Sequence, residues 1–176
     1  MEAHTYLFVK KYSKEDQITR ATWAADCAER VLPLFETAYP EDGRPRSAIE
    51  ACRTWVRTGV FTMAGIRGAS LAAHAAARDA KGNDAAHFAA RAAGQAVATA
   101  HVPQHAYGAA YYALKAVVAA DAANAVANVI REREWQAGRL PEGLREDIME
   151  RIVVLERGGG ICGGGISVKL RKGEGF

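Results

Sequence analysis

Two histidines, His101 and His105, stand four residues apart, the spacing at which two imidazoles on one helical face can bind the same metal ion. Pro103 lies between them and interrupts such a face, no carboxylate is near them in sequence, and there is no HExxH motif. A histidine pair without a third ligand does not define a metal site. We therefore predict no metal and no cofactor, with His101 and His105 as helix-end or core histidines and a metal-binding pair as the alternative.

A second polar pattern is the sequence AAHxAAR, which occurs at residues 72–78 and again at residues 85–91. If the loop at residues 81–84 joins two antiparallel helices, His74 lies level with Arg91, and Arg78 with His87. The four side chains then form one polar band that could bind an anion or an acidic partner surface through charge-assisted hydrogen bonds. The alternative is a solvated helix face, since the first of these two helices carries a continuous polar stripe. The stripe consists of Arg67, Ser70, His74, Arg78 and Lys81.

A third group, Asp42, Arg44 and Arg46, lies in the sequence DGRPR at the expected start of a helix. Two guanidinium groups beside the free backbone N–H groups of a helix N-terminus favour an anion or an acidic partner. In the structural alternative, Asp42 caps the helix, and the two arginines pair with acidic residues of the preceding helices and loop and so tie the first two helices to the third. Those acidic residues are Asp26, Glu36 and Glu41.

The composition limits the class of protein. A chain of 176 residues fits one domain, and a net charge of +3 is too small to imply nucleic acid. Cys27, Cys52 and Cys162 form no CxxC pair, which favours a reducing compartment. No secretory signal and no transmembrane span are predicted, so we expect a cytoplasmic protein without membrane contact. Ser-His-Asp, Walker A and GxGxxG signatures are also missing from the sequence, so no reaction can be read from the residues alone.

Alanine dominates residues 64–135, and because alanine is the best helix former, this segment predicts successive closely packed helices. The expected fold is all-α, a single compact bundle of about seven to eight helices with an Ala-rich core hairpin. Caps and prolines place helices near residues 14–32 with a continuation to 39, then at 45–59, 62–80, 83–101, 104–120, 122–136 and 142–157. A single helical domain is therefore expected over residues 1–157. A flexible, Gly-rich tail, mobile or with a short strand-like ending, is expected over residues 158–176.

Several stretches between residues 20 and 146 resemble the Imm-5-like family of putative immunity proteins. They are WAADCAERVLPLFE at 23–36, YPEDGRPRSAIEA at 39–51, the Ala-rich segments 72–80 and 89–113, REWQ at 133–136 and LPEGLR at 140–145. Asp42, Arg44 and Arg46 match its DxRPR-like motif, and the Ala-rich motif is matched by His74, Arg78, His101 and His105.

The resemblance implies a small helical protein of the cytoplasm that binds and neutralises a cognate bacterial toxin and catalyses no reaction. We therefore expect a protein partner, and no nucleic acid. Two alternatives stay open: a metal-dependent hydrolase that uses His101 and His105, and a structural homo-oligomer that associates through Ala-rich faces.

Overall fold

The computed structural model describes residues 12–60, 62–157 and 165–171, and these residues contain seven helices and one two-stranded sheet. The all-α prediction is confirmed. The helices are α1 (Lys14–Glu36), α2 (Arg44–Thr58), α3 (Met63–Asp79), α4 (Asp84–Ala98), α5 (His105–Ala120), α6 (Ala125–Gly138) and α7 (Glu142–Met149). The strands are β1 (Ile152–Arg157) and β2 (Gly165–Leu170).

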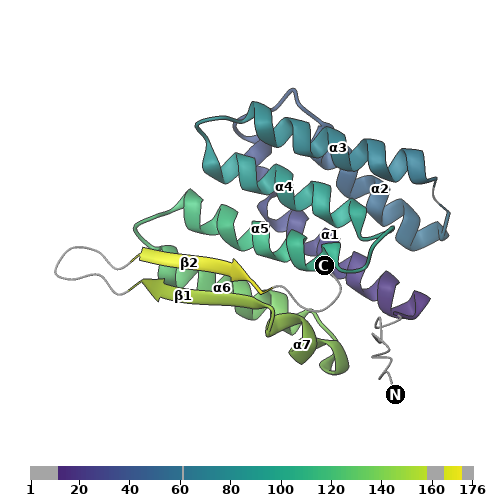
Figure 1. Cartoon of the computed structure of the whole chain (residues 1–176). Coiled ribbons are helices and arrows are strands. Elements are labelled where there is room, and N and C mark those ends of the chain that lie inside the picture. Colours follow the sequence, from purple (N-terminus) through teal and green to yellow (C-terminus); the bar gives the residue numbers. More distant parts are fainter. Residues whose placement is uncertain (1–11, 61, 158–164, 172–176) are drawn as a thin grey trace, which may run out of the picture.

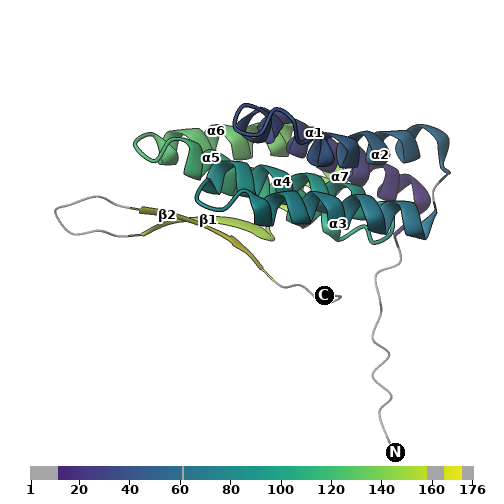
Figure 2. The ribbon, with the colours of Figure 1, turned by 90° about the horizontal axis from the view of Figure 1, so that it is seen from above.

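Helix α4 lies at the centre of the bundle and contacts α1, α2, α3 and α5 (Figure 1). Seen from above, α3, α4 and α5 form one layer and α1, α2 and α6 form the other (Figure 2). The β-hairpin packs against α5. The hairpin therefore covers the α3, α4 and α5 layer on its α5 side, and the outer surface of the layer on the other side is formed by α3.

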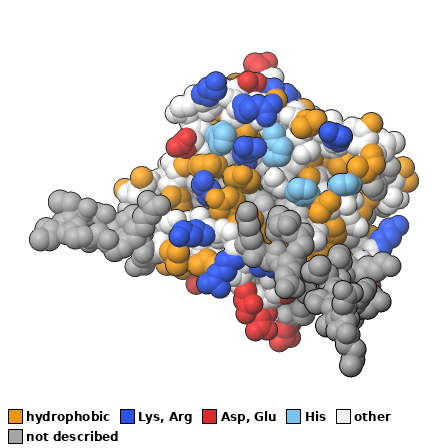
Figure 3. All heavy atoms as spheres, viewed as in Figure 1, with side chains coloured by type: hydrophobic (Ala, Val, Ile, Leu, Met, Phe, Trp, Pro, Cys, Tyr) orange, Lys and Arg blue, Asp and Glu red, His pale blue; other side chains and the backbone are white. Residues whose placement is uncertain are grey.

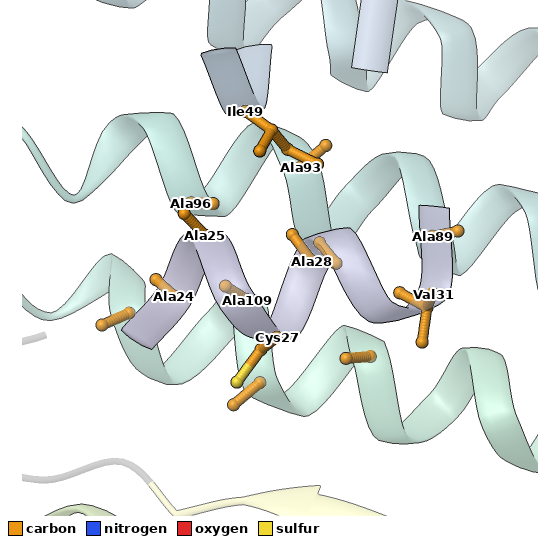
Figure 4. Close-up of a cluster of buried hydrophobic side chains, with 14 of the residues drawn as sticks. Ala24, Ala25, Cys27, Ala28, Val31, Ile49, Ala89, Ala93, Ala96 and Ala109 are labelled. Atoms are coloured by element: carbon orange, nitrogen blue, oxygen red, sulfur yellow. The ribbon is translucent and has the colours of Figure 1, made fainter. Parts of the chain in front are cut away.

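Alanine fills the centre of the bundle. Figure 4 shows Ala24, Ala25 and Ala28 of α1 among alanines of α4 and α5. The short side chains let helix axes approach to about 8 Å, the lower end of the usual range. The predicted Ala-rich core hairpin is α3 with α4, and the buried alanines of these helices are Ala73, Ala76, Ala77, Ala86, Ala89, Ala90, Ala92, Ala93 and Ala96.

Local capping sets three of the helix starts as predicted. The Ser13 hydroxyl accepts a hydrogen bond from the Asp16 amide, and the Thr62 hydroxyl accepts one from Gly65. The Asn83 side chain accepts a bond from the Ala86 amide at 3.0 Å. Each cap satisfies a backbone donor that the first turn leaves without a helical partner.

One buried polar cluster joins α1, α5 and α7. Arg20 has no exposed surface, donates to the Tyr107 hydroxyl at 2.8 Å, and pairs with Asp147 at 3.3 Å. Because a buried guanidinium is tolerated only when it is paired, this cluster fixes how α7 sits on the bundle.

The last predicted helix is wrong beyond Met149. Ile152–Arg157 forms strand β1, which pairs antiparallel with β2 from Ile152↔Leu170 to Arg157↔Gly165. The run Ile152, Val153, Val154 is rich in β-branched side chains, which pack well on a pleated strand. Residues 158–164 and 172–176 of the predicted tail lie outside the described residues. The strand-like ending is found at β2, and the boundary at residue 157 stays a prediction.

Smaller differences concern helix ends. The first helix continues through Pro33 as predicted, but α1 ends at Glu36 rather than at residue 39. Helix α4 ends at Ala98 rather than near His101, and α6 covers Ala125–Gly138 rather than residues 122–136. Among the described residues, no helix has the length and hydropathy needed to cross a bilayer.

Candidate functional site

The two copies of the AAHxAAR repeat lie on α3 and α4, and they bring His74 beside Arg91 as predicted. Arg91 Nη1 lies 3.4 Å from His74 Nδ1. Since a guanidinium can only donate, Nδ1 accepts and the remaining ring proton is on Nε2. Burial, followed by the charges of Arg91 and Arg78, lowers the pKa of His74 to about 4, so its ring is neutral at pH 7.

At the second predicted level, His87 bonds to the backbone beside Arg78. His87 Nδ1 lies 2.7 Å from the Ala77 carbonyl oxygen and donates to it. Arg78 is exposed at the end of α3. On the same layer the Lys115 ammonium lies 4.1 Å from the centre of the Phe88 ring. The bond to the Ala77 carbonyl oxygen holds His87 against α3, and Arg78 and Lys115 add positive charge to the same layer.

The DGRPR group forms a set of intramolecular ion pairs. Arg44 donates to Asp42, at 2.6 Å from Nη2, and also to Asp79 at the end of α3, at 2.8 Å. Arg46 donates from both Nε and Nη2 to Glu36, with the Nη2 contact at 2.8 Å. Hydrogen bonds from Arg44 and Arg46 lower the pKa of Asp42 and Glu36 respectively.

These pairs agree with the structural alternative in part, because Arg46 ties α2 to α1 through Glu36. Asp42 accepts a bond from the Arg44 backbone amide at 3.1 Å, although the N-cap position itself is Gly43. The expected Asp26 partner is used by Arg53 instead. Through Asp79, the DGRPR group lies at the same end of α3 as Arg78, so the two candidate clusters are neighbours.

A cavity of about 300 Å³ opens between α3, the end of α4 and the start of α5. Its polar lining residues are Arg67, Ser70, His74, Gln95, His101 and His105. Its apolar lining residues are Met63, Ile66, Leu71 and Ala98. The fold thus places His74 of the repeat in the same cavity as His101 and His105, the histidine pair on either side of Pro103. Figure 3 shows histidine, basic and apolar side chains together on this face.

Two hydrogen bonds fix the polar groups of the cavity. His105 Nδ1 lies 2.7 Å from Gln95 Oε1, and since an amide oxygen only accepts, the imidazole carries a proton on Nδ1. Burial is the main cause that lowers the pKa of His105, with the neighbouring His101 adding to it. The Ser70 hydroxyl donates to the Gly94 carbonyl oxygen at 3.0 Å.

Two glycines make room for these side chains. A Cβ atom at Gly94 would lie 2.7 Å from the His74 ring, and one at Gly108 would lie 2.7 Å from Gln95 Oε1. Glycine inside a helix is about 1 kcal/mol less favourable than alanine. Helices α4 and α5 each contain a single glycine among many alanines, and in both cases it lies beneath a polar side chain of the cavity.

Sequence reasoning missed the cavity as a unit. Arg67 and Ser70 belong to the polar stripe that favoured a solvated face, and Gln95 carried no motif. Within the described part of the chain, no group of three or more His, Cys, Asp or Glu side chains is arranged to hold a metal ion.

The part of the sequence that forms α1 to α6 and this cavity matches a known protein family. The profile of the family described as "Imm-5 like putative immunity protein" covers residues 10–143. The chain belongs to this family. No curated protein and no solved structure is significantly similar to the chain.

The Imm-5-like match contains every candidate residue named above. It includes the DGRPR group, the repeat and all residues that line the cavity. Among the described residues of the match, the regular elements are α1 to α6 and the start of α7, and the hairpin β1–β2 lies beyond its last residue.

Proposed function

We propose that this Imm-5-like protein is a non-catalytic immunity protein that neutralises a bacterial toxin by direct contact. The observation that carries the proposal is the family match over residues 10–143. We further propose that the complex forms in the cytoplasm, and the free, buried thiols of Cys27 and Cys52 are compatible with a reducing compartment.

The proposed contact surface is the outer face of α3 with the adjoining part of α4. Met63 is 50% exposed and Leu71 is 56% exposed, and Arg67 lies between them on α3. Met and Arg are enriched at protein interfaces, where apolar contacts at the centre are surrounded by polar groups. Arg67 and Arg78 are both exposed, so this surface favours a partner with acidic side chains.

We assign different roles to the candidate residues of this surface. Arg78 is proposed to contact the partner, whereas His74, His87 and Arg91 hold the two helices in register. Asp42, Arg44 and Arg46 are proposed to lock α1, α2 and α3 together, because their charges are already paired within the chain. Exposed ion pairs of this kind stabilise weakly, by about 1 kcal/mol or less each.

Native mass spectrometry of the untagged protein, purified gently from its own host, tests the proposal. We expect a complex with a different protein, and we expect the double variant Arg67→Glu/Arg78→Glu to lose that partner. Arg131→Glu is the matched control, because Arg131 is an exposed arginine on α6. The proposal is wrong if the chain is found only alone or with copies of itself, or if the double variant keeps its partner as well as the control does.

A further inference from the structure

We propose that the cavity between α3, α4 and α5 is a binding site for a carboxylate carried on a compact apolar group. The inference concerns the ligand chemistry of the cavity and does not depend on toxin binding. It follows from the donors that the hydrogen bonds leave available, from the apolar walls, and from the two glycines that keep the cavity open.

Three side chains that line the cavity, His74, Gln95 and Arg67, have donors available to a ligand. His74 accepts at Nδ1 from Arg91, so its remaining polar atom is the Nε2–H donor. Gln95 accepts at Oε1 from His105, which leaves the two N–H donors of its amide. Arg67 adds a permanent positive charge, and none of the described lining residues is acidic. Neutral and cationic donors without a competing carboxylate suit an anion with oxygen acceptors.

The apolar walls determine what the anion must be attached to. Met63, Ile66 and Leu71 of α3 face the cavity from one side, and Ala98 contributes from α4. An inorganic anion would leave these walls without contacts, whereas an apolar group beside the carboxylate would cover them. A volume of about 300 Å³ is at the small end of ligand cavities, so the apolar group is about the size of one ring.

The cavity exists before any ligand binds. His74 and Gln95 occupy positions that a methyl group at Gly94 or Gly108 would obstruct at 2.7 Å. Alanine would be the better helix former at both positions, and it is the commonest residue of both helices. The glycines therefore keep two donor side chains in place, and a ligand loses less free energy to ordering when its site is pre-organised.

Isothermal titration calorimetry with 3-phenylpropionate tests the site, with the uncharged 3-phenylpropionamide as the matched ligand. We expect saturable 1:1 binding of the acid and at least about tenfold weaker binding of the amide. Arg67→Gln should weaken binding of the acid by about tenfold and change binding of the amide much less, because it removes the positive charge and keeps a polar side chain. Arg131→Gln, remote on α6, is the control and should bind as the unchanged protein does.

Gly94→Ala provides a second variant whose fold is supported by the higher helix propensity of alanine. It displaces the His74 ring and should also weaken binding of the acid. The proposal is overturned if the acid shows no saturable binding, if acid and amide bind equally, or if Arg67→Gln binds the acid as the control does.

The peptide Gly-Gly-Phe with a free C-terminus distinguishes the two sources of such a carboxylate. Tighter binding of the peptide than of 3-phenylpropionate assigns the site to the C-terminal residue of a protein chain, and the opposite order assigns it to a free small acid. Both results require the site. Because the titration contains no toxin, its failure is separate from a failure of the immunity function.

Discussion

Acidification should destabilise the protein through His74. The folded ring has a pKa of about 4, compared with an ordinary value of 6.5. Between these values the unfolded chain binds a proton at this position and the folded chain does not. Stability from His74 is therefore fully present above pH 6.5 and is lost as the pH falls towards 4. The charged groups that oppose protonation are Arg91 on α4, Arg78 on α3 and His105 on α5, after burial itself.

The two pKa values set the size of the effect. At about pH 5 the full shift corresponds to a loss of about 2 kcal/mol in the free energy of unfolding relative to pH 7. The His74 ring is only half-buried, and water screens part of the charge interaction, so the expected loss is about 1 kcal/mol. Lowering of the His105 pKa acts in the same direction.

Urea denaturation followed by far-UV circular dichroism, at pH 7 and at about pH 5, measures this loss. His74→Gln keeps a polar side chain that cannot titrate, so the unchanged protein should lose about 1 kcal/mol more than this variant. Burial and the neighbouring His101, which lower the His105 pKa, are the same in both proteins, so most of the His105 contribution cancels in the comparison. Equal losses in the two proteins, or a His74 ring that titrates near pH 6.5 by NMR, would refute the reasoning.

Three further predictions concern the frame that holds the site. Gly59→Ala should cost about 1 kcal/mol by urea denaturation, because Gly59 ends α2 with φ of 69°. Gly68→Ala, in open space inside α3, should instead stabilise the protein, by up to about 1 kcal/mol. Trp23→Phe should lower the free energy of unfolding by about 1–3 kcal/mol, since it removes the buried 2.8 Å hydrogen bond from Nε1 to the Gln136 carbonyl oxygen. An unchanged midpoint of urea denaturation would contradict this. At most one of the three thiols should react with Ellman's reagent in the folded protein at pH 8, whereas all three should react in urea. The reason is that burial raises the pKa of Cys27 and raises that of Cys52 to about 12. Two reactive thiols in the folded protein would be inconsistent with these buried positions.

Local signals predicted the helices well. Ser13, Thr62 and Asn83 cap the turns that follow them, and such caps depend only on neighbouring residues. The level of His74 with Arg91 also followed from sequence, since a short loop between two helices fixes their register.

Strand β1 and the cavity depend on tertiary contacts, which could not be predicted from the sequence. Ile148 and Ile152 have helical spacing, and both are buried, but Ile152 lies in a strand because a partner strand from beyond the glycines pairs with it. The spacing alone does not distinguish these two outcomes. The cavity was missed for a similar reason, because Arg67, Gln95 and His105 come from three helices and share no local motif.

The alanine interior has a consequence for the speed of recognition. An alanine side chain has no rotamer to change, so the centre of the bundle has few alternative packings through which helices could shift. A partner would therefore meet a surface whose backbone is already in its bound shape, as in complexes that form with little rearrangement. We expect association to proceed in one kinetic phase, at a rate set by encounter and orientation rather than by a slow conformational step.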